Sequence, residues 1–156
     1  MDCRTAKMYA GYLQGGMNMQ ITIREPGSAI THFIGMIAAV FAAVPLLVKA
    51  GLTSGEKSFT AMAVFMASMV LLYGASAAYH SVNLKGRALR IFRKLDHMMI
   101  FVLIAGSYTP VCLIVLGGEM GYTLLALVCG IALAGMLIKA FWITCPKWFS
   151  SVIYIS

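Results

Sequence analysis

The stretch SFTAMAVFMASMVLLYGASAAYHSV, residues 58–82, contains no Asp, Glu, Lys or Arg. A helix needs about 20 predominantly apolar residues to cross the hydrocarbon core of a bilayer. This stretch meets that requirement, and so do three others, at residues 28–51, 95–118 and 121–142. The sequence therefore predicts an all-α, polytopic integral membrane helix bundle with four complete transmembrane helices.

The composition of the whole chain agrees with a membrane protein. Of its 156 residues, 61% are hydrophobic and 11% are charged, whereas a soluble domain carries about 25% charged residues. The formal net charge is +7, and in a membrane protein such an excess indicates orientation and anionic headgroups. The sequence has no nucleic-acid-binding motif, and its four cysteines match no zinc or redox spacing. We expect membrane lipids as partners and no nucleic acid.

Two segments flank the apolar runs. Residues 1–24 are polar and lack the apolar region of a signal peptide, so we interpret them as a cytoplasmic tail. Residues 25–156 form the predicted transmembrane domain, in which WFSSVIYIS at residues 148–156 is interpreted as the start of a fifth helix. Nine residues of helix span only about 14 Å of the roughly 30 Å of hydrocarbon. We therefore expect the domain to be incomplete at its C-terminus.

The segments between the apolar runs are rich in turn-forming and charged residues. GLTSGEKS, residues 51–58, and NLKGRALRIFRK, residues 83–94, are expected to be loops between helices. Pro45 and Pro110 lie inside apolar runs and are expected to kink the helices there.

Small residues at helical spacing favour close contact between membrane helices. Gly35 with Ala39 and Gly130 with Ala134 each have the four-residue spacing that such contacts use. Both pairs are therefore candidates for helix interfaces.

The distribution of Lys and Arg predicts the orientation. With the N-terminus inside, ten positive residues fall in inner segments and two, Lys49 and Lys57, in outer ones. The ten are Arg4, Lys7, Arg24, Lys85, Arg87, Arg90, Arg93, Lys94, Lys139 and Lys147. Because positive residues collect on the cytoplasmic side of a membrane, the N-terminus is predicted to be cytoplasmic.

Polar side chains collect at one end of the predicted helices. In this orientation His32 lies near the cytoplasmic start of the first helix and His80 near the cytoplasmic end of the second. Asp96 and His97 fall in the first turn of the third helix. Ser76 lies one turn, about 6 Å, deeper than His80 on the same face. All three histidines and one carboxylate are thus predicted to share one layer at the inner leaflet.

This layer favours a zinc site. Ionisable groups at membrane depth are costly and tend to be functional. A neutral imidazole binds metal well, and a carboxylate commonly orients the imidazole or a bound water. We therefore predict His80 and, as a second candidate, His32 as ligands of Zn²⁺, with Ser76 and Asp96 as catalytic residues that hold an activated water.

Each of these residues also has a purely structural interpretation. His80 can be a polar helix end that reaches the headgroups, and Asp96 can stabilise the positive end of a helix dipole. His97 lies about 100° around the helix from Asp96 and suits the membrane interface. His32 can be a packing histidine, and Ser76 can mediate helix contact. A catalytic zinc needs three protein ligands, and these residues do not complete such a set.

Three stretches, EPGSAITHFIG, YGASAAYHSV and RKLDHMMIFVLIAGSYTP, together resemble the hemolysin III family of bacterial membrane proteins. That family belongs with the progestin and adipoQ receptors and is distantly similar to alkaline ceramidases. The resemblance covers about residues 25–156. It implies seven helices in a bacterial plasma membrane and an inner-leaflet zinc site. His80 would be a ligand, Ser76 and Asp96 would orient ligands or water, and His32 matches the family's first-helix TH element.

The resemblance also implies two further zinc ligands, histidines on the family's last helix, which this sequence does not reach. Three functions stay open at this point. The first is a zinc-dependent hydrolase acting on membrane lipid amides or esters. The second is a hemolysin-like lytic or pore-forming protein, and the third is a non-catalytic regulator of membrane lipid homeostasis.

Overall fold

The computed structural model describes residues 23–53, 55–83 and 85–141. Within these ranges all regular structure is helical, which confirms the predicted fold class. The elements are α2 (Pro26–Thr53), α3 (Gly55–Ser81), α4 (Gly86–Pro110), the π-helical segment η1 (Val111–Leu116) and α5 (Gly118–Phe141). The helices α2, α3, α4 with η1, and α5 are each long and apolar enough to cross a membrane. The expected fifth helix and residues 1–22 of the tail lie outside the described residues.

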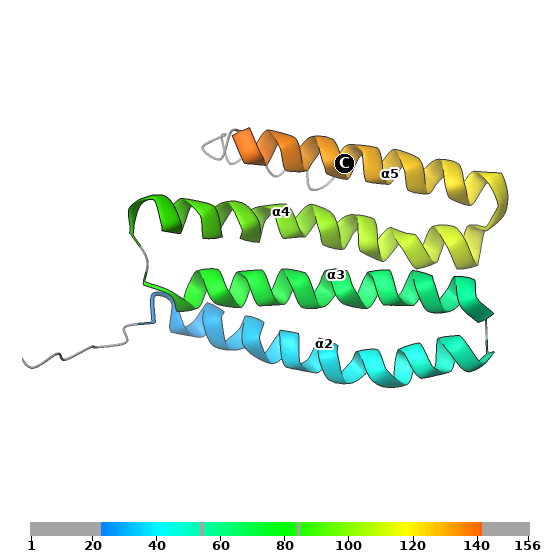
Figure 1. The fold of residues 1–156 in the computed structure, drawn as a ribbon, viewed down its shortest axis with the longest axis horizontal. Coiled ribbons are helices and arrows are strands. Elements are labelled where there is room, and N and C mark those ends of the chain that lie inside the picture. Colours follow the sequence, from blue (N-terminus) through cyan, green and yellow to red (C-terminus); the bar gives the residue numbers. More distant parts are fainter. Residues whose placement is uncertain (1–22, 54, 84, 142–156) are drawn as a thin grey trace, which may run out of the picture.

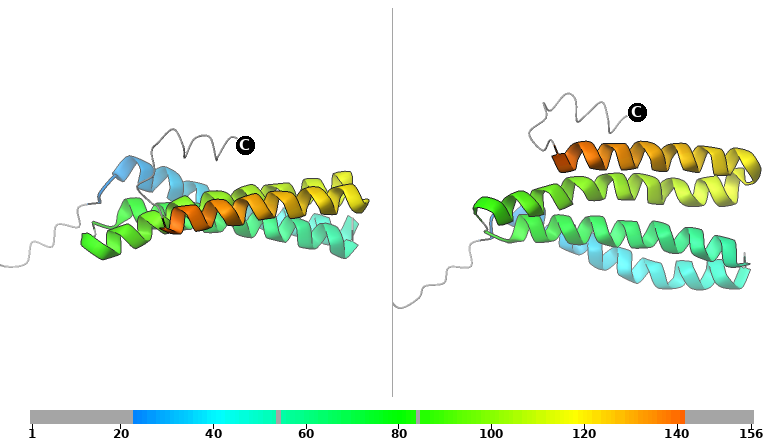
Figure 2. Two further views of the ribbon diagram at one scale, coloured as in Figure 1. Left: turned by 90° about the horizontal axis from the view of Figure 1, so that it is seen from above. Right: turned by 45° about the horizontal axis from the view of Figure 1, so that its top comes forward.

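The four helices lie side by side in chain order as one twisted, antiparallel layer (Figure 1). Each helix packs mainly against its neighbours in sequence, and the two further views show the same order (Figure 2). The start of α2, the end of α3, the start of α4 and the end of α5 therefore meet at one end of the layer. We call this end the polar end, and the other the opposite end.

The layer is apolar outside and lined by small residues inside. Side chains such as Phe41, Leu52 and Val115 are 74%, 82% and 77% exposed. Most of the buried residues are Ala, Gly or Ser. A water-soluble bundle has the reverse distribution, whereas lipid tails solvate large apolar side chains and leave close backbone approach as the main source of helix association. The distribution of side chains thus supports the membrane assignment independently of helix length.

Two glycines allow the helices to approach closely along the layer. A Cβ atom added to Gly106 of α4 would overlap the side chain of Ser68 on α3. A Cβ atom added to Gly135 of α5 would overlap the ring of Phe101 on α4, which is among the most completely buried large side chains of the described residues. These contacts fix how α3, α4 and α5 fit together.

Of the two small-residue pairs expected at interfaces, the structure places one there. A Cβ added to Gly35 would lie 3.0 Å from the ring of Tyr73, and Ala39 is buried. A Cβ added to Gly130 would meet nothing within 4 Å, and Ala134 is exposed. The second expectation was wrong because spacing alone does not say which face of a helix meets a neighbour.

Most of the predicted loop at residues 83–94 is helical, since α4 begins at Gly86. Ala88, Leu89 and Phe92 are half-buried on one face, while Arg87 is exposed. Such a pattern is typical of an amphipathic helix, and Ala, Leu and Arg are good helix formers. The charges therefore lie on the first turns of a helix.

A π-helical segment that starts directly after Pro110 continues α4 as far as Leu116. Its backbone rearranges at the proline, where a kink was expected, because Pro lacks an N–H and disturbs a regular helix. Gly117 and Gly118 end the segment with φ of 60° and 55°. These left-handed conformations are readily adopted only by glycine.

We predict that Gly106→Ala destabilises the protein by about 1–3 kcal/mol, because the new methyl group overpacks the contact with Ser68. Thermal unfolding in detergent, followed by circular dichroism, measures this loss. Gly130→Ala is the matched control and should be neutral, since its Cβ would meet nothing. Adding Ser68→Gly should recover part of the stability of Gly106→Ala. Equal stability of the two alanine variants would contradict the interface.

Candidate functional site

The contact between α2 and α3 brings His32 to the depth of Ser76. Gly35 faces the ring of Tyr73, which sets the register of these antiparallel helices. His32 lies three residues before Gly35, and Ser76 lies three residues after Tyr73, so both are displaced by about 4.5 Å toward the polar end. Ser76 is only 3% exposed.

The contact between α3 and α4 brings Asp96 to a similar depth. Arg93 Nε donates a hydrogen bond of 3.1 Å to the hydroxyl oxygen of Tyr79. Asp96 follows Arg93 by three residues on α4, and Ser76 precedes Tyr79 by three residues on α3. Both therefore lie about the same distance from this contact, toward the middle of the helices. Helices α2, α3 and α4 thus place His32, Ser76 and Asp96 within about one turn of a common level.

The sequence predicted that Asp96 lies in the first turn of its helix, but the structure places it further along α4. It follows Gly86 by ten residues, nearly three turns, because α4 starts earlier than predicted. The helix dipole acts within the first turn, so that interpretation of Asp96 was wrong. Its side chain is 15% exposed and lies 3.6 Å from His97 Nδ1, while the same nitrogen lies 2.8 Å from the carbonyl oxygen of Arg93.

His80 is held by a carboxylate that the sequence analysis did not identify. Its Nδ1 lies 2.8 Å from Glu25 Oε2, and the backbone N–H of Glu25 donates to the carbonyl oxygen of His80 at 3.1 Å. Because an ionised carboxylate only accepts, Nδ1 carries the hydrogen of this contact, and Nε2 is left for another partner. Glu25 and His80 lie 55 positions apart, so nothing in the sequence pattern pointed to this contact.

His32 lies beside His80 and has an unpaired nitrogen. The two rings stack, with centroids 5.6 Å apart and planes 20° from parallel. His32 also lies 5.9 Å from the ring of Tyr73. Its Nδ1 is buried and has no hydrogen-bond partner among the described residues. A buried nitrogen without a partner is costly, so it marks the place where a proton donor or metal would be stabilising.

Tyr79 connects this cluster to two arginines. Its ring meets His80 edge-on, with centroids 4.9 Å apart. The guanidinium carbon of Arg24 lies 4.8 Å from the centre of the Tyr79 ring, and Arg24 Nη2 lies 3.6 Å from Glu25 Oε1. Glu25 therefore contacts both a histidine and an arginine.

The donor set fits zinc in part. The pairing of Glu25 with His80 has the form in which a carboxylate orients a metal-binding imidazole. The rings of His32 and His80 lie side by side, with centroids 5.6 Å apart. Within residues 23–53, 55–83 and 85–141, no three or more His, Cys, Asp or Glu side chains form a group that could hold a metal. The assignments of Ser76 and Asp96 remain predictions.

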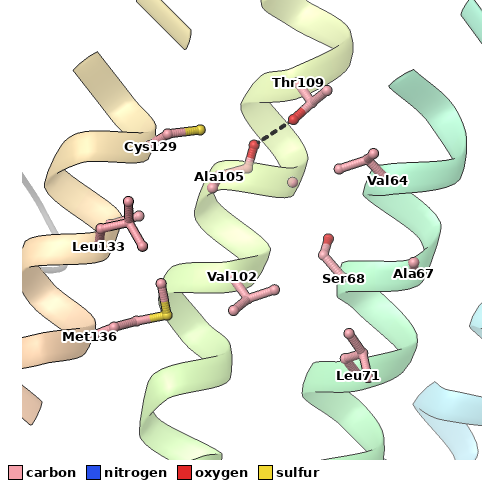
Figure 3. Close-up of a pocket in the computed structure, with 12 residues that line it drawn as sticks. Val64, Ala67, Ser68, Leu71, Val102, Ala105, Thr109, Cys129, Leu133 and Met136 are labelled. Atoms are coloured by element: carbon pink, nitrogen blue, oxygen red, sulfur yellow. Dashed lines mark hydrogen bonds between the residues drawn. The ribbon is translucent and has the colours of Figure 1, made fainter. Parts of the chain in front are cut away.

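A second feature, an open groove of about 480 Å³, lies between α3, α4 and α5 (Figure 3). Its polar groups are used within their own helices. Ser68 Oγ donates to the carbonyl of Phe65, and Thr109 Oγ1 donates to the carbonyl of Ala105. The groove offers apolar contact only and brings no reactive groups together.

Comparison with known proteins identifies the class to which this fold and cluster belong. The profile of the family described as Haemolysin-III related matches residues 20–156. The chain therefore belongs to the hemolysin III family, as the sequence motifs indicated. No solved structure matches it significantly.

Individual relatives support the same conclusion. The chain is 38% identical over 124 residues to Hemolysin-3 of Bacillus cereus, a match that covers 80% of this chain and 56% of the relative. It is 37% identical over 135 residues to the Hemolysin-3 homolog of Bacillus subtilis (strain 168), covering 86% and 63%. It is also 34% identical over 87 residues to Progestin and adipoQ receptor-like protein 1 of Caenorhabditis elegans, covering 55% and 20%. The chain spans less than two thirds of the length of each of these relatives.

We predict that Glu25 and His80 are energetically coupled. In a double-mutant cycle of Glu25→Ala and His80→Ala, unfolding in mixed detergent with a chelator present should give a coupling of about 0.5–1.5 kcal/mol. We expect no larger coupling energy than this because the Glu25 carboxylate is 43% exposed. The pair Glu25→Ala and His97→Ala should be additive, since His97 bonds within its own helix. Additivity in the first cycle would contradict the contact.

Proposed function

We propose that this protein contributes part of a zinc-dependent site at the inner leaflet, and that this site hydrolyses an amide or ester bond of a membrane lipid. The contact of 2.8 Å between Glu25 Oε2 and His80 Nδ1 carries the proposal. It leaves Nε2 of the imidazole available in a layer that also holds the buried Ser76 and, on α4, Asp96. This layer lies near the helix ends, where the polar linkages of a phospholipid or sphingolipid meet its acyl chains.

In this proposal His80 is a zinc ligand and Glu25 positions it. His32, whose ring centroid lies 5.6 Å from that of His80, is a second candidate ligand. Ser76 and Asp96 would hold and orient the attacking water. A bound zinc would supply Lewis-acid activation of that water at neutral pH. The ligands that complete the set would come from the length of the relatives that this chain does not match.

A lytic function is the second candidate, because the Bacillus cereus relative is called Hemolysin-3. A water-filled pathway needs polar lining, and the groove between α3, α4 and α5 is almost entirely apolar. The polar cluster therefore favours the hydrolase, and lysis or regulation of lipid homeostasis becomes an outcome of the test below.

We expect a chimaera of this chain and the remaining C-terminal length of the Bacillus subtilis relative to bind about one zinc per molecule. His80→Ala should remove the zinc and the release of fatty acid from ceramide or phospholipid together. Metal analysis and lipid mass spectrometry measure the two effects. His97→Ala, on the same end of the layer, is the control and should retain both.

Lipid turnover that persists in the zinc-free His80→Ala chimaera would refute the hydrolase. Dye release from vesicles by a chimaera that binds no zinc and turns over no lipid would support the lytic function instead. A change in membrane fluidity without either activity would support a regulatory function.

We also propose that the polar end faces the cytoplasm of a bacterial cell, supported by the excess of positive residues there. Arg87→Cys and Lys57→Cys test this, each in a chain with Cys3→Ser and Cys145→Ser. A membrane-impermeant thiol reagent should label Arg87→Cys only in inside-out vesicles and Lys57→Cys only in intact spheroplasts. Cys112 is buried and Cys129 half-buried, so neither should react. The reverse labelling would overturn the orientation.

A further inference from the structure

Positive charge is concentrated at the polar end of the layer. Among the residues that the structure describes, seven Lys and Arg lie there with two acidic residues, whereas the opposite end has two of each. The seven are Arg24, Lys85, Arg87, Arg90, Arg93, Lys94 and Lys139; the acidic residues are Glu25 and Asp96. An excess of this kind at one membrane surface attracts anions. The side chains of two of these arginines converge.

Arg24 is incompletely satisfied by the protein. Its Nη1 is buried and has no hydrogen-bond partner within the described part of the chain. Its Nη2 lies 3.6 Å from Glu25 Oε1, which is longer than a hydrogen bond. The guanidinium is held in place over the ring of Tyr79, at 4.8 Å from the ring centre. It is thus positioned by a cation–π contact while hydrogen-bond donors remain unused.

Arg93 reaches the same tyrosine from α4. Its Nε donates to the Tyr79 hydroxyl oxygen at 3.1 Å, and the residue is exposed. Tyr79 itself is only 7% exposed, so its packed ring holds the two arginine side chains in place. A hydroxyl that accepts from Arg93 also keeps a hydrogen of its own to donate. The two guanidinium groups thus both contact Tyr79, and its hydroxyl group is a third donor beside them.

We propose that Arg24 and Arg93, positioned by Tyr79, bind the phosphate of an anionic phospholipid. Guanidinium groups suit this ligand because their planar donors match phosphate oxygens. Both arginines lie at the end of a layer whose outer surface is apolar, which favours a lipid over free phosphate. Ile23 precedes Arg24 at 44% exposure, and Ile30 and Phe33, further along α2, are 55% and 54% exposed. The acyl chains of a lipid whose headgroup lies on the arginines would follow this apolar surface. The site requires neither zinc nor hydrolysis.

The test measures phosphatidylglycerol binding to the purified full chain in detergent by native mass spectrometry. Arg24→Gln with Arg93→Gln should weaken binding at least about tenfold more than Arg87→Gln with Arg90→Gln, since lost charge-assisted hydrogen bonds add to an equal loss of charge. Tyr79→Phe, which removes no charge, should weaken it several-fold. Diacylglycerol with the same acyl chains should bind far more weakly than phosphatidylglycerol.

Equal losses in the two double variants would overturn the proposal in favour of diffuse attraction. Displacement of the lipid by inorganic phosphate at comparable concentration would make free phosphate the ligand and overturn the lipid assignment. Unchanged binding by Tyr79→Phe would overturn the geometry. Melting curves matched between the double variants exclude misfolding as the cause of a difference, and Arg24→Lys with Arg93→Lys, which keeps both charges, should still bind more weakly than the parent.

Discussion

Close backbone approach is the constraint on which this structure depends. In lipid, large apolar side chains gain little by turning inward, so association relies on van der Waals packing and hydrogen bonds between helices. Gly106 against Ser68 and Gly135 against Phe101 supply that packing along α3, α4 and α5. The resulting layer exposes residues such as Phe141, at 87%, to the surrounding lipid. Its few polar side chains are confined to the helix ends and interfaces.

Helix register then decides which polar groups meet. Once Gly35 faces Tyr73, the start of α2 is carried to the end of α3, and Glu25 can pair with His80 through both side chain and backbone. A slip of one residue rotates a helix by about 100° and would separate them. The cluster at the polar end is therefore a consequence of small-residue packing some distance away.

The sequence predicted the helices well because hydropathy over about 20 residues is a local property. It failed at the start of α4, where the charges of residues 85–94 looked like a loop but belong to an amphipathic helix. It identified His80 as a candidate but missed Glu25, whose importance depends on a contact across 55 positions. Likewise Gly35 and Gly130 look alike in sequence, and only the packing shows that one faces a helix.

The Glu25 carboxylate links the two sites proposed for the polar end. One of its oxygens lies 2.8 Å from His80 Nδ1 and the other 3.6 Å from Arg24 Nη2. A phosphate drawn to Arg24 would compete with the longer of these contacts and leave the shorter one in place. Glu25 would then be free to interact more strongly with the imidazole. If both proposals hold, binding of an anionic headgroup and the orientation of His80 would be joined through this one side chain.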